Sequence, residues 1–351
     1  MRLEFIKNLK GSEVLARTIY SSNGTALITA GHKINELFIQ KLMDCGIYLV
    51  YIEDERFDDI IEDPILNDLK QTALQSLPTL FSNLINSSNI YLKEDLKQVD
   101  GLLRYIVDSK SANINLYEVK VYDEYTYIHC VDTAIMSVFL GMTLGYNKDS
   151  LKELGRAAVL HDIGKMKIPN IVLNKKGPLT NEEFSLIKMH PRYSREILEN
   201  TSMFSHKILD AVEQHHERVD GRGYLRGLKE SEISDYAKII TVCDVFTAIS
   251  ANRCYRARFA PNEAYEYILM GSNTMFSKAV VDKFRQTFAI YPLGCCVRLS
   301  NGVEGFVVKQ NIGFPDRPVL RIVHNPKINS NVQNYELNLL EQVNVVIKEV
   351  V

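Results

Sequence analysis

One short group of polar residues constrains this chain more than any other feature of its sequence. His161, Asp162 and Lys165 stand within the five-residue stretch HDIGK, inside the largely apolar run RAAVLHDIGKMKIP at positions 156–169. Burying such groups costs free energy unless hydrogen bonds or opposite charges compensate for the lost water. The fold must therefore bring partners to these side chains from elsewhere in the chain.

Histidines are concentrated in the same central region of the sequence. Six of the eight lie between positions 129 and 216, and all but His206 fall in the segments DEYTYIHCVDTA, VLHDIGKMKIP, LIKMHPRYS and VEQHHERVDGRGY. A single histidine on a helix is more often an ordinary core or surface residue than a ligand. We interpret His206 as structural or exposed, and His32 and His324 as surface residues. The candidates for a shared site are His129, His161, His190, His215 and His216.

Asp244 provides the strongest reason to group these residues. It interrupts the run YAKIITVCDVFTAIS, in which apolar neighbours cover most of the helix circumference, so the helix should be buried nearly all round. A buried carboxylate needs a cation or several donors. Imidazole and carboxylate groups together suit divalent transition metals such as iron, manganese or zinc. The sequence therefore predicts a buried metal centre.

The number of candidate ligands is sufficient for two ions. Two metals about 3.5–4 Å apart are the usual device for phosphoester hydrolysis, because they activate a bridging water and hold the attacked phosphate. A carboxylate such as that of Asp162 can bridge them. Lys165 follows Asp162 by three residues, so on a helix it shares that face and would neutralise a phosphate oxygen. Without a metal nearby, Lys165 would be an ordinary solvated lysine.

Composition excludes several classes of partner. Of the 351 residues, 46% are apolar and 24% charged, and the net charge is −2. The absence of a basic excess argues against a DNA or RNA duplex as partner. The N-terminus lacks the apolar core of a signal peptide, and no segment approaches the roughly 20 uncharged apolar residues of a membrane span. The six scattered cysteines, without a CxxC pair, indicate reduced thiols. We expect a cytoplasmic protein with no membrane contact.

The hydrophobic patterns divide the chain into four parts. Residues 1–64 form a small α/β module of possible regulatory role, with an Asn-Gly hairpin at 22–24 and a helix capped by Asn35 with Gly46 after its end. Residues 65–108 are helical, with breaks expected at Pro78 and at 87–89, and serve to connect modules, to form a homodimer or simply to pack. Residues 109–292 are predominantly helical. Residues 293–351 form a β-rich appendage with a second Asn-Gly hairpin in CVRLSNGVEGFVVKQ.

Local signals around the candidate ligands fit this organisation. Thr180 and Glu183 have the spacing of a capping box, which would open the helix that delivers His190. Pro191 should mark a kink or break that sets the direction of His190. Arg218, Asp220 and Gly221 predict a tight polar loop after the histidine pair, able to orient the ligands.

These motifs resemble the HD-GYP family of the HD phosphohydrolase superfamily. The matching segments are DEYTYIH, LHDIGKMKIPNIVLNKKGPLTNEEF, MHPRYSREIL, HHERVDGRGYLRGL and KIITVCDVFTAISANRCYRA. HDIGK is shared by many HD hydrolases, whereas HHERVDGRGY and the segment ending in GPLTNEE are more specific. The resemblance covers about residues 109–310. It implies a mainly α protein whose core is an HD-domain helical bundle, carrying the small α/β module and the β appendage at its ends.

The resemblance also implies a function and a set of site residues. The implied activity is hydrolysis of cyclic di-GMP to pGpG or GMP with two divalent metals, iron or manganese. Lys165 matches the phosphate-contacting lysine, Gly223 and Tyr224 belong to the signature loop, and Arg253 and Arg256 match substrate-contacting basic positions. GGDEF-type or other signalling proteins are the implied partners. The implied metal ligands are His129, His161, His190, His215, His216, Asp244 and Asp162, the last as the bridge.

Two departures from the family pattern qualify this picture. The signature reads Gly223-Tyr224-Leu225, so a leucine stands where the family has proline, which restores a backbone N–H and frees φ. We expect altered loop mobility or partner contacts, not lost catalysis. Some members carry a glutamate four residues before the first histidine that helps to hold a third metal, and here that position is Tyr125. We therefore expect two metals.

Other functions remain open at this point. An HD hydrolase could act on a mononucleotide, against which the HHERVDGRGY loop argues, or on cyclic GMP-AMP, which the sequence does not exclude. A non-catalytic module that binds cyclic di-GMP and signals through residues 1–108 is a second class. Because every expected two-metal ligand is present, catalysis is favoured over binding alone. A helical scaffold with incidental histidines would leave the buried Asp244 unexplained.

Overall fold

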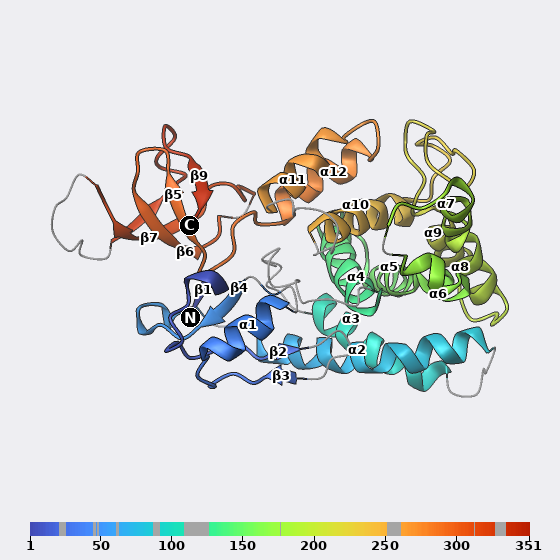
Figure 1. The fold of residues 1–351 in the computed structure, drawn as a ribbon. Coiled ribbons are helices and arrows are strands. Elements are labelled where there is room, and N and C mark those ends of the chain that lie inside the picture. Colours follow the sequence, from blue (N-terminus) through green and yellow to red (C-terminus); the bar gives the residue numbers. More distant parts are fainter. Residues whose placement is uncertain are drawn as a thin grey trace.

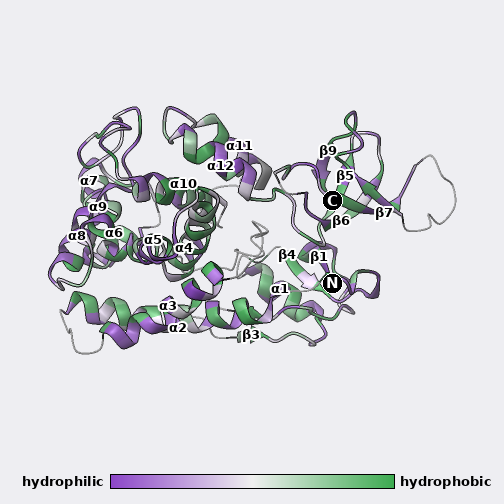
Figure 2. Ribbon diagram, turned by 180° about the vertical axis from the view of Figure 1, so that it is seen from behind, coloured by the Kyte–Doolittle hydropathy of each residue, from purple (hydrophilic) through white to green (hydrophobic). Residues whose placement is uncertain are grey.

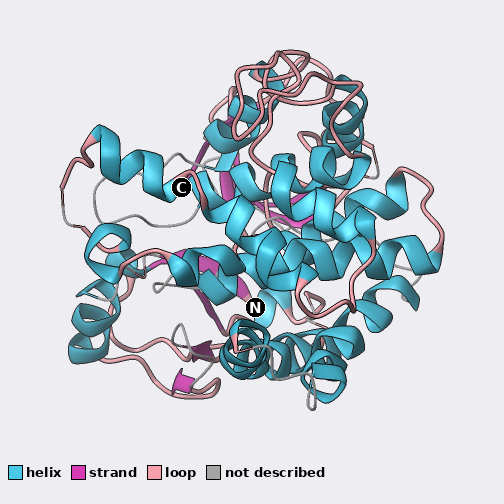
Figure 3. Cartoon of the chain, turned by 90° about the vertical axis from the view of Figure 1, so that its right-hand side faces the viewer, coloured by secondary structure: helices cyan, strands magenta, loops and turns pink. Residues whose placement is uncertain are grey.

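Helices make up most of the described part of the molecule (Figure 3), and its strands lie toward the two ends of the chain, within residues 2–52 and 296–350. The computed structural model describes residues 1–20, 26–44, 47, 49–60, 63–86, 92–108, 126–175, 177–250, 261–311, 313–326 and 335–351. Within these ranges, no helix has both the length and the apolar character needed to cross a bilayer. The predicted fold class, a mainly α protein with small α/β and β parts at its ends, is confirmed.

The helical body extends from the second helix to the twelfth (Figure 1). Its elements are α2 (Pro64–Ile85), α3 (Leu92–Asp108), α4 (Thr126–Thr143), α5 (Lys148–Leu160), the 3₁₀ helix η3 (Ile163–Lys167), α6 (Asn170–Leu173), α7 (Asn181–Ile187), α8 (His190–Glu199), α9 (His206–Gln214), α10 (Asp235–Ser250), α11 (Pro261–Met270) and α12 (Lys278–Thr287).

The centre of this body is built on α4, α5 and α10. α4 packs against both α5 and α10, and the three helices contribute to one continuous apolar cluster. The prediction that the helix carrying Asp244 is buried nearly all round is confirmed, since most residues of α10 are buried and apolar residues recur along its ribbon (Figure 2). Burial of this apolar surface is the main force holding the bundle together. Any polar group that these helices bury must therefore find its partners inside the bundle.

Helices α2 and α3 belong to the same core. Leu77, Phe81 and Leu103 are fully buried in the cluster that also contains α4 and α5 residues. Between α2 and α4, Lys70 Nζ lies 2.6 Å from Asp132 Oδ1, and both side chains are less than a tenth exposed. The packing interpretation of this segment is therefore supported, and a role in homodimer formation stays a prediction.

The break expected at Pro78 is wrong. Pro78 lies inside an uninterrupted α2, whose start is capped by the Asp63 carboxylate accepting from two backbone N–H groups. Proline removes only one helical hydrogen bond, and the neighbouring Leu77, Leu80 and Phe81 are buried against the core. Tertiary burial thus outweighs the local cost. The second expected break, at 87–89, lies outside the described residues.

The N-terminal module contains two strand pairs and a short helix. Strand β1 (Arg2–Phe5) pairs antiparallel with β4 (Leu49–Ile52), and β2 (Ile19–Tyr20) with β3 (Ala26–Ile28). The β2–β3 pair confirms the predicted hairpin, although its turn at 22–24 lies outside the described residues. Gly46, predicted to follow the end of the first helix, also lies outside them. Helix α1 (Glu36–Asp44) begins where expected, with Asn35 Oδ1 accepting from the Phe38 N–H at 2.9 Å. Short 3₁₀ turns occupy η1 (Ile6–Asn8) and η2 (Glu55–Phe57). Strand β1 was not anticipated from the sequence.

The C-terminal appendage is an antiparallel sheet with strand order β8-β7-β6-β5-β9. The predicted Asn-Gly hairpin is confirmed as the β5–β6 pair. Its strands are β5 (Cys296–Leu299), β6 (Glu304–Lys309), β7 (Val319–His324), β8 (Glu336–Asn338) and β9 (Ile347–Val350).

The two terminal modules pack against each other, although the helical body separates them in sequence (Figure 1). Leu3 and Tyr51 share an apolar cluster with residues of the C-terminal sheet. The Leu3 N–H donates to the Gly294 carbonyl at 2.8 Å. The rings of Phe57 and Phe306 lie 4.6 Å apart, centroid to centroid. The modules thus form a joint unit at one end of the molecule.

Candidate metal centre

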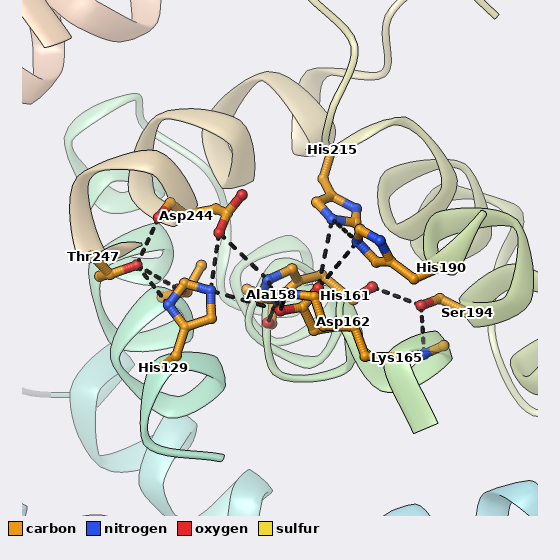
Figure 4. A network of polar contacts seen from close by, with 12 residues as sticks. His129, Ala158, His161, Asp162, Lys165, His190, Ser194, His215, Asp244 and Thr247 are labelled. Atoms are coloured by element: carbon orange, nitrogen blue, oxygen red, sulfur yellow. Dashed lines mark hydrogen bonds and ion pairs between the residues drawn. The ribbon is translucent and has the colours of Figure 1, made fainter. Parts of the chain in front are cut away.

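Five separate segments deliver the predicted ligands to one place (Figure 4). His129 lies in the first turns of α4, and His161 and Asp162 lie between the end of α5 and the start of η3. His190 is the first residue of α8, His215 and His216 directly follow α9, and Asp244 is in the second half of α10. Three overlapping groups of these residues each bring their ligand atoms within 4.8 Å of one another. All seven predicted residues are members of at least one group.

The two carboxylates lie at the centre of this arrangement. His129 Nε2 lies 2.9 Å from Asp244 Oδ1, and His216 Nδ1 lies 3.8 Å from the other oxygen of Asp244. Asp162 Oδ1 is 3.2 Å from His190 Nε2, while its Oδ2 is 3.4 Å from His161 Nε2. Asp162 also belongs to two of the three groups, one with His129 and His161 and one with the other histidines. Its position is therefore that of a bridge between two halves of the site.

Three of the imidazoles are oriented by backbone carbonyls that lie just before them in the chain. The Nδ1 atoms of His161, His190 and His215 each lie 2.7–2.8 Å from a backbone carbonyl three residues earlier. A carbonyl only accepts, so Nδ1 carries the proton and Nε2 presents its lone pair to the centre. The acceptor carbonyls are those of Ala158, Ile187 and Val212. Such hydrogen bonds fix the tautomer and direction of metal-binding histidines.

Thr247 orients a fourth histidine of the site, His129, and sequence reasoning missed it. Its Oγ1 lies 3.1 Å from His129 Nδ1 and 2.9 Å from the carbonyls of Cys243 and Asp244. The hydroxyl donates to a carbonyl and accepts from His129, which turns His129 Nε2 toward Asp244. Thr247 follows Asp244 by three residues, so one helical turn of spacing was the available signal.

Gly164 and Ser194 join the HD segment to α8, and neither was singled out from the sequence. Ser194 Oγ donates to the His161 carbonyl at 2.7 Å and accepts from the Gly164 N–H at 2.9 Å. A Cβ on Gly164 would lie 2.0 Å from the His190 carbonyl oxygen and 2.5 Å from the Ser194 nitrogen. Only glycine permits this approach, which a single sequence does not reveal.

The local signals before His190 are confirmed with one correction. The capping box of Thr180 and Glu183 is present at the start of α7. However, α7 ends at Ile187, so the helix that it opens does not carry His190. A new helix begins at His190 with Pro191 in its first turn, as expected from the missing N–H and restricted φ of proline. The break sets the histidine at a helix N-terminus.

Burial and charge together determine the ionisation of the site. Burial alone would raise the pKa of Asp162, but Lys165 and His161 outweigh it and hold this pKa well below its usual value. Burial would also raise the pKa of Asp244, but contacts with His129 and His161 outweigh this effect and keep that pKa well below its usual value. Burial lowers the pKa of His216 to about 3 despite the nearby Asp244. Ionised carboxylates and a neutral imidazole are the forms that bind metals.

The residues present fit a divalent metal. The buried His161 Nε2 and Asp162 Oδ1 both face the centre, and neither makes a hydrogen bond of acceptable geometry within the described part of the chain. Buried polar atoms without partners are rare and call for an explanation such as a bound ion. The donor set of imidazole nitrogens and carboxylate oxygens suits iron, manganese or zinc.

Lys165 lies at the edge of the centre. Its Nζ is 2.5 Å from Asp162 Oδ2, and its side chain is one-fifth exposed. The 3₁₀ turn of η3 brings the two residues to the same side, as their spacing of three predicts. The ammonium is therefore held beside the carboxylate and still reaches the surface.

The loop after the histidine pair covers one side of the centre. The Tyr224 ring stacks on the His216 ring, with centroids 4.8 Å apart. The backbone N–H of Tyr224 donates to the His216 carbonyl at 3.2 Å. A Cβ on Gly223 would lie 2.4–2.7 Å from backbone atoms of Glu217 and Arg218. Glu217, also missed from the sequence, is buried and accepts from the N–H groups of Arg226 and Leu228 at 2.6 and 2.9 Å.

The predicted polar loop around Arg218 and Asp220 is present. The Arg218 guanidinium donates twice to the Asp220 carboxylate, at 3.1 and 2.6 Å, and Gly221 adopts a φ of +77° that favours glycine. Other predicted positions, Arg253, Arg256 and Tyr125, lie outside the described residues. His206, His32 and His324 are exposed and belong to none of the three ligand groups, in agreement with their interpretation as structural or surface residues.

Comparisons with known proteins agree with the motifs. The model of the HD domain family matches residues 79–280, more than half of the chain. A model described as a KOW domain associated with HD domain matches residues 296–351. In its fold, the chain is similar to Bd1817, an HDG"Y"P protein from Bdellovibrio bacteriovorus, with a TM-score of 0.52 at 17% identity over 80% of this chain and 97% of that one.

Several relatives have names that state an activity. The chain is 36% identical to cyclic di-GMP phosphodiesterase PA4108 of Pseudomonas aeruginosa, over 61% of this chain and 51% of that protein. It is 36% identical to a cyclic di-GMP phosphodiesterase of Thermotoga maritima, over 65% and 64%. It is 32% identical to 3'3'-cGAMP-specific phosphodiesterase 3 of Vibrio cholerae, over 66% and 48%. The chain thus spans about half to just under two thirds of the length of these relatives.

Proposed function

This chain belongs to the HD domain family, as a member of its HD-GYP group, and from this premise we propose that it is a metal-dependent phosphodiesterase that hydrolyses cyclic di-GMP to pGpG, GMP or both. The observation that carries the proposal is the convergence of five histidines and two aspartates, with ligand atoms within 4.8 Å in each group. Names of relatives that include cyclic di-GMP support this choice of substrate.

The roles of the residues follow from their positions. His129, His161 and Asp162 would hold one divalent ion, and His190, His215 and His216 with Asp162 the other, while Asp244 completes the set. When bound, the pair of ions, iron or manganese, supplies Lewis acidity and an activated water for attack on phosphorus. Asp162, kept ionised by its surroundings, would be the ligand that both ions share.

Lys165 and the rim of the metal centre, formed by the loop that carries Gly223 and Tyr224, would position the substrate. The Lys165 ammonium, beside Asp162, would neutralise charge that develops on a phosphoryl oxygen during the displacement. Gly223 allows the signature loop to approach the backbone of Glu217 and Arg218, and Tyr224 covers His216, so both are proposed to line the substrate pocket. Arg253 and Arg256 are proposed to contact the guanine or phosphate groups. GGDEF-type partners and a homodimer through 65–108 stay predictions.

The central test combines metal content with turnover. Protein purified without oxygen is analysed for metals, and the products from cyclic di-GMP are identified by chromatography. We expect two ions per chain and formation of pGpG or GMP, with both reduced strongly by His161→Ala and Asp162→Ala. His206→Ala is the matched control, since His206 is exposed at the start of α9 and should change neither quantity. Unchanged turnover in the two site variants would contradict the enzymatic proposal.

A competition between substrates separates the remaining alternatives. The 3'3'-cGAMP-specific relative makes cyclic GMP-AMP the second candidate substrate. Values of kcat/KM for the two cyclic dinucleotides, measured on one metal-loaded preparation, decide between them. Tight binding of cyclic di-GMP by a metal-loaded protein that cleaves neither dinucleotide would instead indicate a non-catalytic signalling module.

A further inference from the structure

A second cation lies on the rim of the centre, apart from Lys165. Lys188 is the C-cap residue that directly follows helix α7, two residues before His190. Its Nζ lies 4.5 Å from the centre of the Phe184 ring and 5.7 Å from the centre of the Tyr224 ring. Tyr224 in turn stacks on His216. A single aromatic ring therefore separates the Lys188 ammonium from one of the candidate metal ligands.

The surroundings hold this ammonium without neutralising it. Within the part of the chain that the structure describes, Lys188 has no carboxylate partner, in contrast to Lys165 with Asp162 and Lys175 with Glu183. Aromatic faces attract a cation through their quadrupole but carry no net charge. The positive charge thus remains available to an anion that approaches the rim.

A simpler role would be stabilisation of the helix end. A cation near the last carbonyls of a helix interacts favourably with its dipole, and Lys188 is the residue that closes α7. This role explains the location of Lys188 along the chain. It does not explain why its ammonium lies between two aromatic rings, one of which comes from the distant loop that covers the metal centre.

We propose that Lys188 binds the second phosphodiester of the cyclic dinucleotide, the one that is not being cleaved. This inference rests on the proposed function. A cyclic dinucleotide carries two phosphodiester anions on opposite sides of its macrocycle, and only one can occupy the metal centre with Lys165. The other needs a cation nearby on the rim, and a compact ammonium is a suitable point charge for phosphate. Lys188 would thereby favour cyclic dinucleotides over linear ones.

The test compares two ligands that differ in the second phosphodiester. Cyclic di-GMP has two such groups, whereas the linear dinucleotide GpG has the same two bases and one. The affinity of the metal-loaded protein for hydrolysis-resistant phosphorothioate forms of both is measured by calorimetry. Lys188→Met should weaken binding of the cyclic ligand roughly tenfold or more and leave that of GpG within about twofold. Lys188→Arg should retain most of the preference.

A matched control comes from the same region of the molecule. Lys167 also lies over an aromatic ring, with Nζ 5.6 Å from the centre of Tyr193, but it has Glu196 at 3.8 Å. Lys167→Met should alter neither affinity. Equal weakening of both ligands by Lys188→Met would show that the lysine acts on a base or on the metal centre, and no weakening would reduce it to a helix cap. Either result overturns the proposal.

The outcomes also separate this inference from the proposed function. If the protein cleaves cyclic di-GMP but Lys188→Met leaves the ratio of affinities unchanged, the function stands and the role of Lys188 is wrong. If the protein binds both phosphorothioate ligands and the ratio of affinities falls in Lys188→Met, but the wild-type protein does not cleave unmodified cyclic di-GMP, the role of Lys188 stands and the enzymatic proposal is wrong. If the wild-type protein binds neither ligand, both are wrong.

Discussion

Gly164→Ala tests how the HD segment is fixed against α8. The added Cβ would lie 2.0 Å from the His190 carbonyl oxygen and 2.5 Å from the Ser194 nitrogen. Both are backbone atoms, so no side chain can rotate away. Since non-bonded carbon atoms are most stable at about 3.5–4.0 Å, η3 and α8 must separate by an ångström or more. That movement carries Asp162 and Lys165 away from His190.

The expected consequences can be stated for stability and for activity. Overpacking of a close contact costs typically about 1–3 kcal/mol, which a shift of the urea midpoint measures. A displacement of about 1 Å among groups that act together can lower the rate about a hundredfold. We therefore expect kcat/KM for cyclic di-GMP to fall by about that factor, together with a loss of metal from the half of the site that contains His190.

Gly101→Ala provides the matched control. Gly101 is a helical glycine in α3 whose added Cβ would meet only the Leu69 side chain, at 4.0 Å. This variant should be about 0.5–1 kcal/mol more stable, because alanine is the better helix former, and its activity should be unchanged. If Gly164→Ala keeps full metal content and activity, the close approach of η3 to α8 does not set the geometry of the site.

Two further substitutions test how the rest of the chain supports this site. Lys70→Met removes the ammonium that lies 2.6 Å from the buried Asp132 carboxylate, which should cost about 3–5 kcal/mol in the free energy of unfolding measured with urea. Phe306→Ala removes the ring that contacts Phe57 and should cost about 3–5 kcal/mol, read from amide hydrogen exchange in the N-terminal module. The loss of stability in Phe306→Ala is expected in the N-terminal module only if the two terminal modules stabilise each other.

Each of these variants has its own check. The double substitution of Lys70→Met with Asp132→Leu should recover much of the lost stability, because it removes both buried charges. Phe314 is half-exposed, so Phe314→Ala should leave exchange in the N-terminal module unchanged. Exchange that is equally slow in Phe306→Ala and in the wild-type protein would contradict the joint unit.

The features that sequence predicts well are those with a local physical signature. The apolar run around Asp244 specifies a helix buried nearly all round, and the structure has it. The capping box at Thr180 and the proline after His190 specify a helix start and a break, and both occur. In each case, neighbouring residues determine the backbone, so a single sequence contains the information.

The features that sequence misses depend on contacts between distant segments. Strand β1 is paired with β4, far along the chain, and its short length gives little periodicity. Pro78 is tolerated because burial of the neighbouring Leu77, Leu80 and Phe81 in the core outweighs one lost hydrogen bond. The role of Gly164 appears only when α8 is placed beside it. Tertiary packing decides all three.

This division between local and distant contacts also applies inside the metal centre. His161 and His215 are oriented by carbonyls of the helices that they follow, α5 and α9, and His190 by the Ile187 carbonyl at the end of the preceding α7, so each ring direction is set by a residue three positions earlier in the chain. Their positions relative to one another instead depend on packing between elements, such as the hydrogen bonds of Ser194 to the HD segment. Disruption of the packing contacts should therefore change the spacing of ligands that remain correctly oriented. A site of this kind loses affinity for its ions before it loses its helices.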